Sequence, residues 1–222
     1  MSDVKFEVGA DIGTVSGILR RPPDARLLYV LAHGAGAGMR HRFMEAMSEA
    51  LAACGIASLR YQFPYMEAGG RPPDPPAVLH ATVRAAVAEA ARVAPDLPLV
   101  AGGKSLGGRM TSGAAARDPL PGVAGLAFLG FPLHPAKRPG TSRAEHLGNV
   151  KQPMLFLQGT RDDLADLELM TAVCRRLGPG ATLHVVEGAN HAFEVLKRSG
   201  RTDEDVRAEL ARTVAAWYQN GL

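Results

Sequence analysis

The stretch LVAGGKSLGGRM, residues 99–110, fits two motifs that imply different chemistries. Its GKS tripeptide, residues 103–105, resembles the end of a phosphate-binding Walker A loop, whereas GKSLG, residues 103–107, fits the G-x-S-x-G pattern of a nucleophile elbow. A Walker A loop needs glycine five positions before its Gly-Lys pair, but Pro98 stands there. The spacing therefore excludes the phosphate loop and leaves Ser105 as a candidate nucleophile.

Short apolar segments alternate along the chain with longer amphipathic segments, and this alternation predicts the fold class. The predicted buried strands are residues 27–32, 56–60, 97–102, 123–129, 153–158 and 181–186. The predicted helices are residues 42–53, 76–94, 106–116, 164–177 and 202–220. Because strand and helix take turns, we predict an α/β fold with a mostly parallel sheet that helices cover on both faces.

The first part of the chain follows a different pattern. Residues 4–19 alternate around a Gly-containing turn, which predicts a hairpin and hence antiparallel strands at the N-terminal edge of the sheet. The Pro/Gly-rich segment 64–76 is predicted to be a loop rather than a domain linker. A chain of 222 residues, 46% hydrophobic and 21% charged, has an ordinary size for one α/β domain, so we predict a single domain over residues 1–222.

Charge and composition argue against several classes of function. The net charge of +3 is small and the arginines are scattered, so we predict no binding to nucleic acid. Cys54 and Cys174 are too few for a disulfide framework or a zinc cluster. The first residues lack the basic and apolar regions of a signal peptide, and no apolar run reaches the roughly 18 residues of a membrane span. We therefore expect a cytoplasmic protein that binds no membrane.

A serine nucleophile needs a histidine base and a carboxylate that orients the histidine, in the chain order Ser, acid, His. Asp162 and Asp163 follow one predicted strand, and His191 follows the next. Because the carboxyl ends of parallel strands meet at one edge of a sheet, three strands would bring Ser105, Asp162 and His191 together. The pattern indicates acyl transfer through a covalent intermediate.

The choice of the acid stays open between neighbouring residues. Asp162 is favoured because it lies nearer the end of the strand, while Asp163 is well placed to cap a helix that begins near Leu164, and Asp166 is a further acid beside them. Lys104 has two alternatives, since its side chain either reaches the mouth of the site or is only solvated.

The segment HGAGAG, residues 33–38, follows a predicted strand and supplies small residues whose backbone amides can approach a substrate oxygen. We predict oxyanion donors at Ala35 and at Leu106, the residue after the nucleophile. The same glycines fail the dinucleotide pattern G-x-G-x-x-G in both registers, because Met39 and His41 occupy the required glycine positions. No cofactor is expected.

The remaining histidines have other expected roles. His33 is predicted to brace the loop that it opens, and His184 lies inside a predicted strand, so neither is a good base. The other four are predicted to lie at the surface or in loops without metal-ligand spacing, and no metal is expected; they are His41, His80, His134 and His146.

Four segments together resemble the α/β-hydrolase superfamily, in particular compact dienelactone-hydrolase-like proteins; they are HGAGAG (33–38), GGKSLGGR (102–109), GTRD (159–162) and NHAF (190–193). By this resemblance Ser105, Asp162 and His191 match the triad positions, and Ala35 and Leu106 match the oxyanion positions. Two features depart from the family. The dienelactone hydrolases proper have cysteine at the nucleophile position, and many relatives carry a cap domain where only residues 131–150 stand here, so we predict no large cap.

The resulting hypothesis is a serine hydrolase that cleaves a small-molecule ester or thioester through an acyl-enzyme on Ser105. The alternative is a non-catalytic protein-interaction module that retains the fold. The sequence leaves open the substrate and whether the chain forms a homodimer. An anionic substrate would be favoured if nearby arginines line the site; these are Arg40, Arg42, Arg60 and Arg71.

Overall fold

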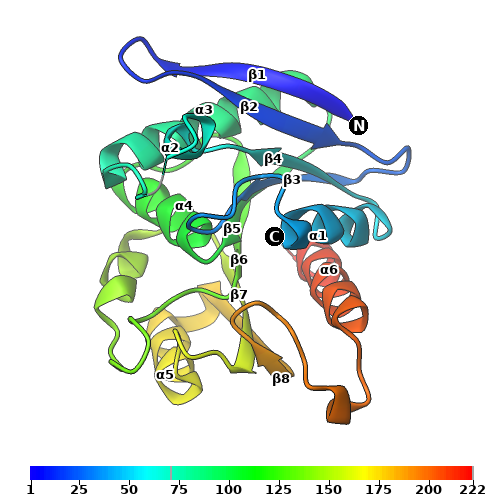
Figure 1. Ribbon diagram of the computed structural model, residues 1–222, viewed down its shortest axis with the longest axis vertical. Coiled ribbons are helices and arrows are strands. Elements are labelled where there is room, and N and C mark those ends of the chain that lie inside the picture. The colour runs from blue at the N-terminus through cyan, green and yellow to red at the C-terminus, as the bar shows by residue number, and fades with distance from the viewer. Residues whose placement is uncertain (71, 222) are drawn as a thin grey trace.

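The computed structural model describes residues 1–70 and 72–221. Within them, eight strands form one sheet in the spatial order β1-β2-β4-β3-β5-β6-β7-β8 (Figure 1). The strands are β1 (Ser2–Gly9), β2 (Gly13–Arg20), β3 (Leu27–Ala32), β4 (Ile56–Tyr61), β5 (Leu99–Lys104), β6 (Val123–Leu129), β7 (Met154–Arg161) and β8 (Ala181–Asn190). Strands β3 to β8 pair in parallel, and the β1–β2 hairpin joins β4 antiparallel at one edge.

The helices lie on both faces of this sheet. The α-helices are α1 (Arg42–Ala52), α2 (Pro64–Glu67), α3 (Pro76–Val93), α4 (Leu106–Arg117), α5 (Leu167–Leu177) and α6 (Asp203–Gln219). Three short 3₁₀ helices are η1 (Ser142–Asn149), η2 (Gly178–Gly180) and η3 (Lys197–Ser199). Helices α1 and α6 lie together on one face, and α3, α4 and α5 lie on the other (Figure 1). No helix in this part of the chain is long and apolar enough to cross a membrane.

Strand β3 shows why the sheet is buried on both faces. All six residues of LLYVLA are buried, and alternate side chains of a strand point to opposite faces. Tyr29 and Leu31 belong to the apolar cluster that includes α1 and α6, whereas Leu28 and Val30 belong to the cluster that includes α3, α4 and α5. A strand covered on both faces needs a continuous apolar run rather than an alternating one, as this sequence has.

The strand order creates a crevice at the carboxyl edge of the sheet. From β3 the chain passes through α1 to β4 on one side, and from β4 it returns through α3 to β5 on the other side of β3. The connections therefore leave β3 and β5 in opposite directions, and ligands bind outside the carboxyl ends of strands at such a reversal. Ser105 follows β5 at this point.

The predicted α/β fold with its N-terminal antiparallel edge is confirmed, and several local boundaries differ: β7 ends three residues and β8 four residues beyond the predicted ends. Strand β5 runs two residues further than expected, so Lys104 is its last residue. The segment 64–76 contains the short helix α2. Helix α5 begins at Leu167 and is capped by Asp166, whose side chain accepts from the Leu169 amide, so Asp163 is not the cap.

Candidate active site

Ser105 occupies a sharp turn between β5 and α4. Its backbone has φ 52° and ψ −114°, a region that non-glycine residues rarely adopt. The Ser105 amide donates to the Leu129 carbonyl at 3.1 Å, which ties the turn to the neighbouring strand β6. A strained serine between a buried strand and a helix is the geometry of a nucleophile elbow, which presents the hydroxyl above the sheet.

The two glycines of GKSLG are required by the end of β3. A Cβ atom on Gly103 would lie 2.3 Å from the Ala32 carbonyl oxygen, and one on Gly107 would lie 2.6 Å from the same oxygen. Both distances are far below van der Waals contact, so any side chain at either position would push the turn away from β3. The motif is therefore a packing requirement of this fold.

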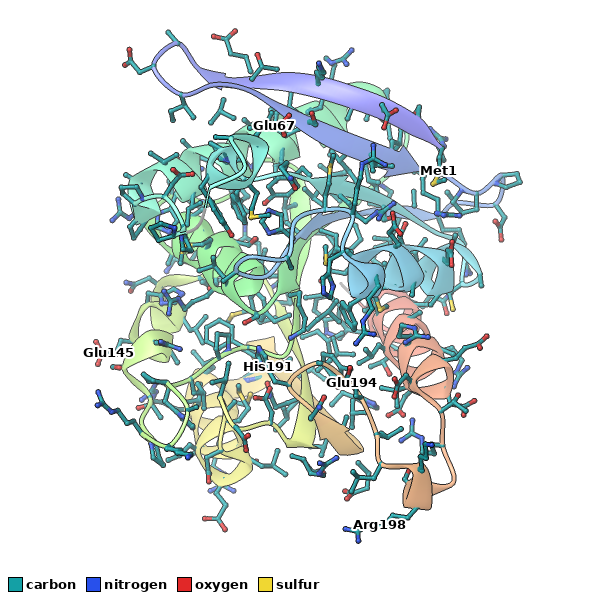
Figure 2. The ribbon with its side chains drawn as sticks, in the orientation of Figure 1. Met1, Glu67, Glu145, His191, Glu194 and Arg198 are labelled. Carbon is teal, nitrogen blue, oxygen red and sulfur yellow. The ribbon has the colours of Figure 1, made fainter. Side chains whose placement is uncertain are left out.

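A continuous hydrogen-bond chain joins Ser105, His191 and Asp162. The distance from Ser105 Oγ to His191 Nε2 is 2.9 Å, and the distance from His191 Nδ1 to Asp162 Oδ2 is 2.7 Å. Ser105 directly follows β5, Asp162 directly follows β7, and His191, which is labelled in Figure 2, directly follows β8, so three strand ends deliver the three side chains. The structure thus brings together the three residues that the sequence placed at one sheet edge.

Asp162 is held more firmly than its neighbour Asp163. The Asp162 side chain is buried and also accepts hydrogen bonds from the Leu164 amide at 2.8 Å and from Gln158 Nε2. Burial raises the pKa of Asp162, but the His191 hydrogen bond and charge, the Leu164 amide and the Lys104 ammonium together lower the pKa below its ordinary value. Asp163 is exposed and makes no side-chain hydrogen bond to the described residues.

Two backbone amides beside Ser105 come from separate segments, since Leu106 follows Ser105 in the chain and Ala35 lines the same cavity. Leu106 begins α4, where the first amides of a helix have no partner within the helix, and Ala35 lies exposed in the loop after β3. Neither amide has a hydrogen-bond acceptor within residues 1–70 and 72–221. Gly36 and Gly38 in this loop have positive φ angles of 67° and 70°, a conformation that glycine adopts without strain.

The loop after β3 is fixed from below at several points. His33 Nδ1 lies 2.8 Å from the Gly34 carbonyl, and His33 Nε2 accepts from the Phe63 amide at 3.1 Å, so the bracing predicted for His33 is present. Burial lowers the pKa of His33 to about 4, and the bond to the Gly34 carbonyl opposes this shift. The neutral ring is also the form that can accept from Phe63.

Met39 lies at the end of the same loop, and hydrogen bonds hold both its backbone amide and its backbone carbonyl. Its amide donates to Gln62 Oε1 at 2.8 Å, and its carbonyl accepts from Arg60 Nη1 at 3.0 Å. Arg60 is buried beneath the loop, and its Nη1 lies 3.9 Å from Glu45 Oε1. Sequence reasoning did not identify Gln62 or this role of Arg60, because both act through the backbone of a distant segment.

Three other histidines lie away from Ser105, and His134 is in a loop, as predicted. His134 is buried, and its Nε2 accepts from the Asp166 amide at 3.0 Å, next to the start of α5. His146 lies in η1, with its Nε2 2.7 Å from Ser112 Oγ. His184 pairs with Glu209 at 2.7 Å on the sheet face under α6. None of these rings contacts Ser105.

A cavity of about 340 Å³ opens in front of Ser105 and has largely apolar walls. It is lined by Gly34, Ala35, Ala37, His41, Phe43, Met44, Lys104, Ser105, Leu164, His191 and Ala192. No arginine within the described ranges lines it: Arg40 pairs with Asp3, and Arg42 pairs with Glu194. Arg71, the fourth arginine considered from the sequence, lies outside the described residues. The described arginines therefore give the cavity no anion-binding character.

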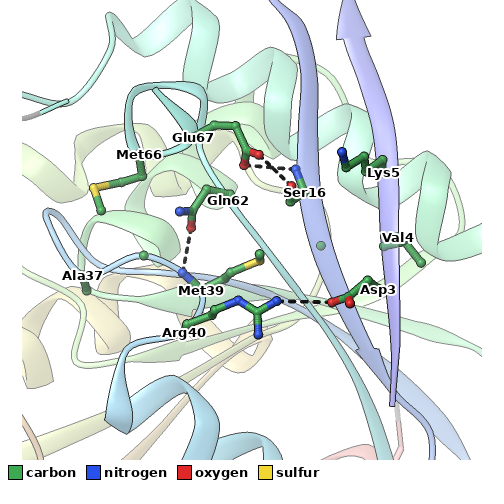
Figure 3. A pocket seen from close by; sticks show the side chains of 12 residues that line it. Asp3, Val4, Lys5, Ser16, Ala37, Met39, Arg40, Gln62, Met66 and Glu67 are labelled. Carbon is green, nitrogen blue, oxygen red and sulfur yellow. Dashed lines mark hydrogen bonds and ion pairs between the residues drawn. The ribbon is translucent and has the colours of Figure 1, made fainter. Parts of the chain in front are cut away.

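A second hollow of about 490 Å³ lies on the other side of the loop after β3. Figure 3 shows its polar lining, in which Glu67 accepts from Ser16 and the Gln62 side chain accepts from the Met39 amide. Ala37 lines both hollows, so the loop forms their shared wall. None of the three residues Ser105, Asp162 and His191 lines this larger hollow.

Comparison with known proteins places the chain in a family. Residues 25–219 match the model of the α/β hydrolase domain, and the chain belongs to this family. Three solved structures are similar throughout their length. A serine hydrolase homologue from Coxiella burnetii is 18% identical with a TM-score of 0.76, covering 96% of this chain and 98% of its own.

The second structure, a serine hydrolase without a lid from Xanthomonas campestris, is 20% identical, with a TM-score of 0.74 and coverage of 97% of this chain and 94% of its own. Dienelactone hydrolase from Anabaena variabilis is also 20% identical, with a TM-score of 0.76 and coverage of 100% and 97%. At these identities the similarity establishes the shared α/β hydrolase fold.

Proposed function

We propose that the protein is a serine hydrolase that cleaves an ester or thioester through an acyl-enzyme on Ser105. One observation carries this proposal: the hydrogen-bond chain from Ser105 through His191 to Asp162, with the serine on a strained turn. A serine hydroxyl becomes a useful nucleophile when a base accepts its proton and a carboxylate holds that base in the productive tautomer.

The proposed mechanism assigns one role to each group. Ser105 Oγ attacks the carbonyl carbon while His191 Nε2 accepts the hydroxyl proton. Asp162 fixes the Nδ1–H tautomer and stabilises the imidazolium that forms. The imidazolium then donates its proton to the leaving alcohol or thiol. Water, deprotonated by the same histidine, attacks the acyl-enzyme and releases the acid.

The amides of Ala35 and Leu106 are the proposed donors to the oxyanion. Both lack an acceptor within the described residues, and they belong to different segments, one before α1 and one at the start of α4. Fixed donors aimed at developing charge lower the barrier because they need no reorganisation during reaction. The bonds that hold Gly36 and Met39 to Tyr65 and Gln62 keep the Ala35 segment in place.

The cavity suggests the size and polarity of the substrate. Its volume of about 340 Å³ and its apolar walls favour a short, uncharged acyl ester or thioester. Only the 3₁₀ helix η1 and loops stand between β6 and β7, so residues 130–153 provide no cap domain over the site. The similar proteins named dienelactone hydrolase and serine hydrolase without a lid agree with hydrolysis at an open site.

A fluorophosphonate probe tests this proposal, because it labels an activated serine and ignores an inert one. We expect labelling of the wild type at Ser105 and none of the Ser105→Ala variant. A panel of neutral and anionic p-nitrophenyl esters and acyl thioesters of increasing length would then identify the substrate class. Absence of labelling in folded protein would contradict the proposal and favour the interaction module.

A further inference from the structure

Lys104 precedes Ser105 directly and is the last residue of β5. The residue lines the cavity but is not solvated, because it is only 9% exposed and its Nζ is shielded from solvent. Within the described ranges, Nζ also has no hydrogen-bond partner. An ammonium that is buried without such a partner is costly, so its place in the site calls for compensating interactions.

Two aromatic rings provide part of this compensation. Nζ lies 5.9 Å from the ring centroid of Phe43 on α1 and 5.5 Å from that of Phe193 in the loop after β8. The two rings stack against each other, with centroids 5.9 Å apart and planes 17° apart. Ring faces attract a cation, most strongly where water is excluded.

On its other side the ammonium borders the His191–Asp162 hydrogen bond. The site that a Cβ of Gly130 would occupy lies 3.1 Å from Lys104 Nζ and 3.5 Å from both Asp162 Oδ2 and His191 Nδ1. The ammonium and both partners of the hydrogen bond therefore surround one point. Gly130 has φ 68°, and a larger residue there would enter this space.

The charged and titratable groups around this point come from three segments. Asp162 follows β7 and acts on Lys104, while His191 and Glu194 follow β8. From the start of α1, His41 lines the cavity, and Arg42 is paired with Glu194 at the surface. Asp162 is thus the buried negative charge of this region. It accepts a hydrogen bond from His191 and interacts electrostatically with the Lys104 ammonium.

Burial lowers the pKa of Lys104 to about 8, and the charge of Asp162 opposes that shift. The side chain is therefore mainly an ammonium at neutral pH. Since Nζ is shielded from solvent although Lys104 lines the cavity, its charge acts with little screening on the buried groups beside it.

We propose that Lys104 is a positioning residue whose buried ammonium acts electrostatically on the neighbouring His191–Asp162 pair, without a direct bond to it, and so disfavours a second positive charge on the His191 ring. This inference rests on the proposed function, in which the neutral ring is the base. A cation beside a carboxylate stabilises the ionised acid, and it disfavours a second cation on the same carboxylate. Lys104 would then extend activity to lower pH.

The test compares Lys104→Met, which keeps length and apolar volume but removes the charge, with Lys151→Met, which removes an exposed lysine outside the site. The kcat/KM profile is measured from pH 4.5 to 9 on the best ester. We expect the acidic midpoint to rise by roughly one pH unit in Lys104→Met and to stay unchanged in Lys151→Met. KM at the plateau should stay within about twofold, because Nζ is shielded from solvent and methionine keeps the apolar lining.

A spectroscopic readout makes the test independent of turnover. The proton between His191 Nδ1 and Asp162 is followed by NMR during titration, and its midpoint should shift with that of kcat/KM. Unchanged midpoints in a folded Lys104→Met protein overturn the inference, as does a uniform loss of activity without a shift. If Lys104→Met does not fold, Lys104→Gln replaces it under the same criteria. Fluorophosphonate labelling separately reports whether the proposed function has failed.

Discussion

The two hollows beside the loop after β3 differ in size and in chemistry. The larger one, about 490 Å³, is lined by polar groups such as Glu67, Ser16 and Arg40, and the smaller one, about 340 Å³, has apolar walls around Ser105. The ion pair in the larger hollow is exposed to solvent, because the side chains of Arg40 and Asp3 are 64% and 79% exposed. Such pairs contribute little, since solvent screens them.

The smaller cavity concentrates its polar groups against an apolar background. Asp162 and Lys104 are both buried, so their charges act on each other and on His191 with little screening. The comparison teaches that the site proposed to be reactive is distinguished by exclusion of water around a few fixed groups, and not by the volume of its hollow. Substitutions in either hollow, or in the loop that separates them, test this difference.

The largest effect is expected at the nucleophile. Ser105→Ala should lower kcat by roughly 10⁴- to 10⁶-fold, because the covalent step is lost while the surrounding fold remains. The measurement is kcat on the best ester, with circular dichroism and the thermal midpoint as controls of folding. Turnover equal to the wild type would show that the smaller cavity is not the reactive one.

The second comparison separates two neighbouring acids. Asp162→Asn should reduce kcat/KM by up to about 10⁴-fold, because the amide can favour the wrong imidazole tautomer and removes the charge that stabilises the imidazolium. Asp163→Asn is the matched control, since Asp163 is exposed and makes no side-chain hydrogen bond to the described residues. Its kcat/KM should stay within about twofold of the wild type. A crippled Asp163→Asn enzyme would contradict the assignment.

A third effect concerns stability and arises beneath the wall. Because burial lowers the pKa of His33 to about 4, the unfolded chain binds a proton at higher pH than the folded one does. This contribution to stability is fully present above the unfolded value, about 6.5, and is lost as pH falls toward about 4. The free energy of unfolding, measured with urea at several pH values, should fall over that range.

His33→Gln is the variant that sharpens this result. Its amide can replace part of the hydrogen bonding to Gly34 and Phe63 but does not titrate. The variant should be less stable at pH 7 and should lose less stability between pH 6.5 and pH 4. An equal acid dependence in both proteins would assign the effect to other groups, such as His80, whose pKa burial also lowers to about 4.

Local sequence was sufficient for most of the fold and for locating the three side chains that are proposed to react. The apolar run of β3 predicts burial on both faces, and GKSLG requires a close approach by another strand, which proves to be Ala32 at the end of β3. The order of Ser105, Asp162 and His191 at strand ends follows from parallel pairing, since each strand end lies at the same edge.

The sequence could not show contacts that depend on which distant segments meet. Lys104 is buried because Phe43 and Phe193, far apart in the chain, both pack against it. A lysine at a predicted strand end is ordinarily solvated, so nothing local indicates this burial. Asp166, not Asp163, caps α5 because the turn after β7 continues to Ala165, whose amide donates to the Asp162 carbonyl. Helix starts depend on such turns.

The smallest effects are expected beside the loop after β3, which separates the two hollows. One substitution next to this loop and one in the larger hollow should differ in their effect on activity. Gln62→Leu removes the acceptor of the Met39 amide and should lower kcat/KM about tenfold, because a lost hydrogen bond of about 1 kcal/mol loosens the segment that carries Ala35. Glu67→Gln weakens only the contact with Ser16 in the larger hollow. We expect unchanged kcat/KM and a loss of about 1 kcal/mol or less in unfolding free energy. Equal losses of activity in both variants would show that the two hollows act as one site, and the loop would then not separate them functionally.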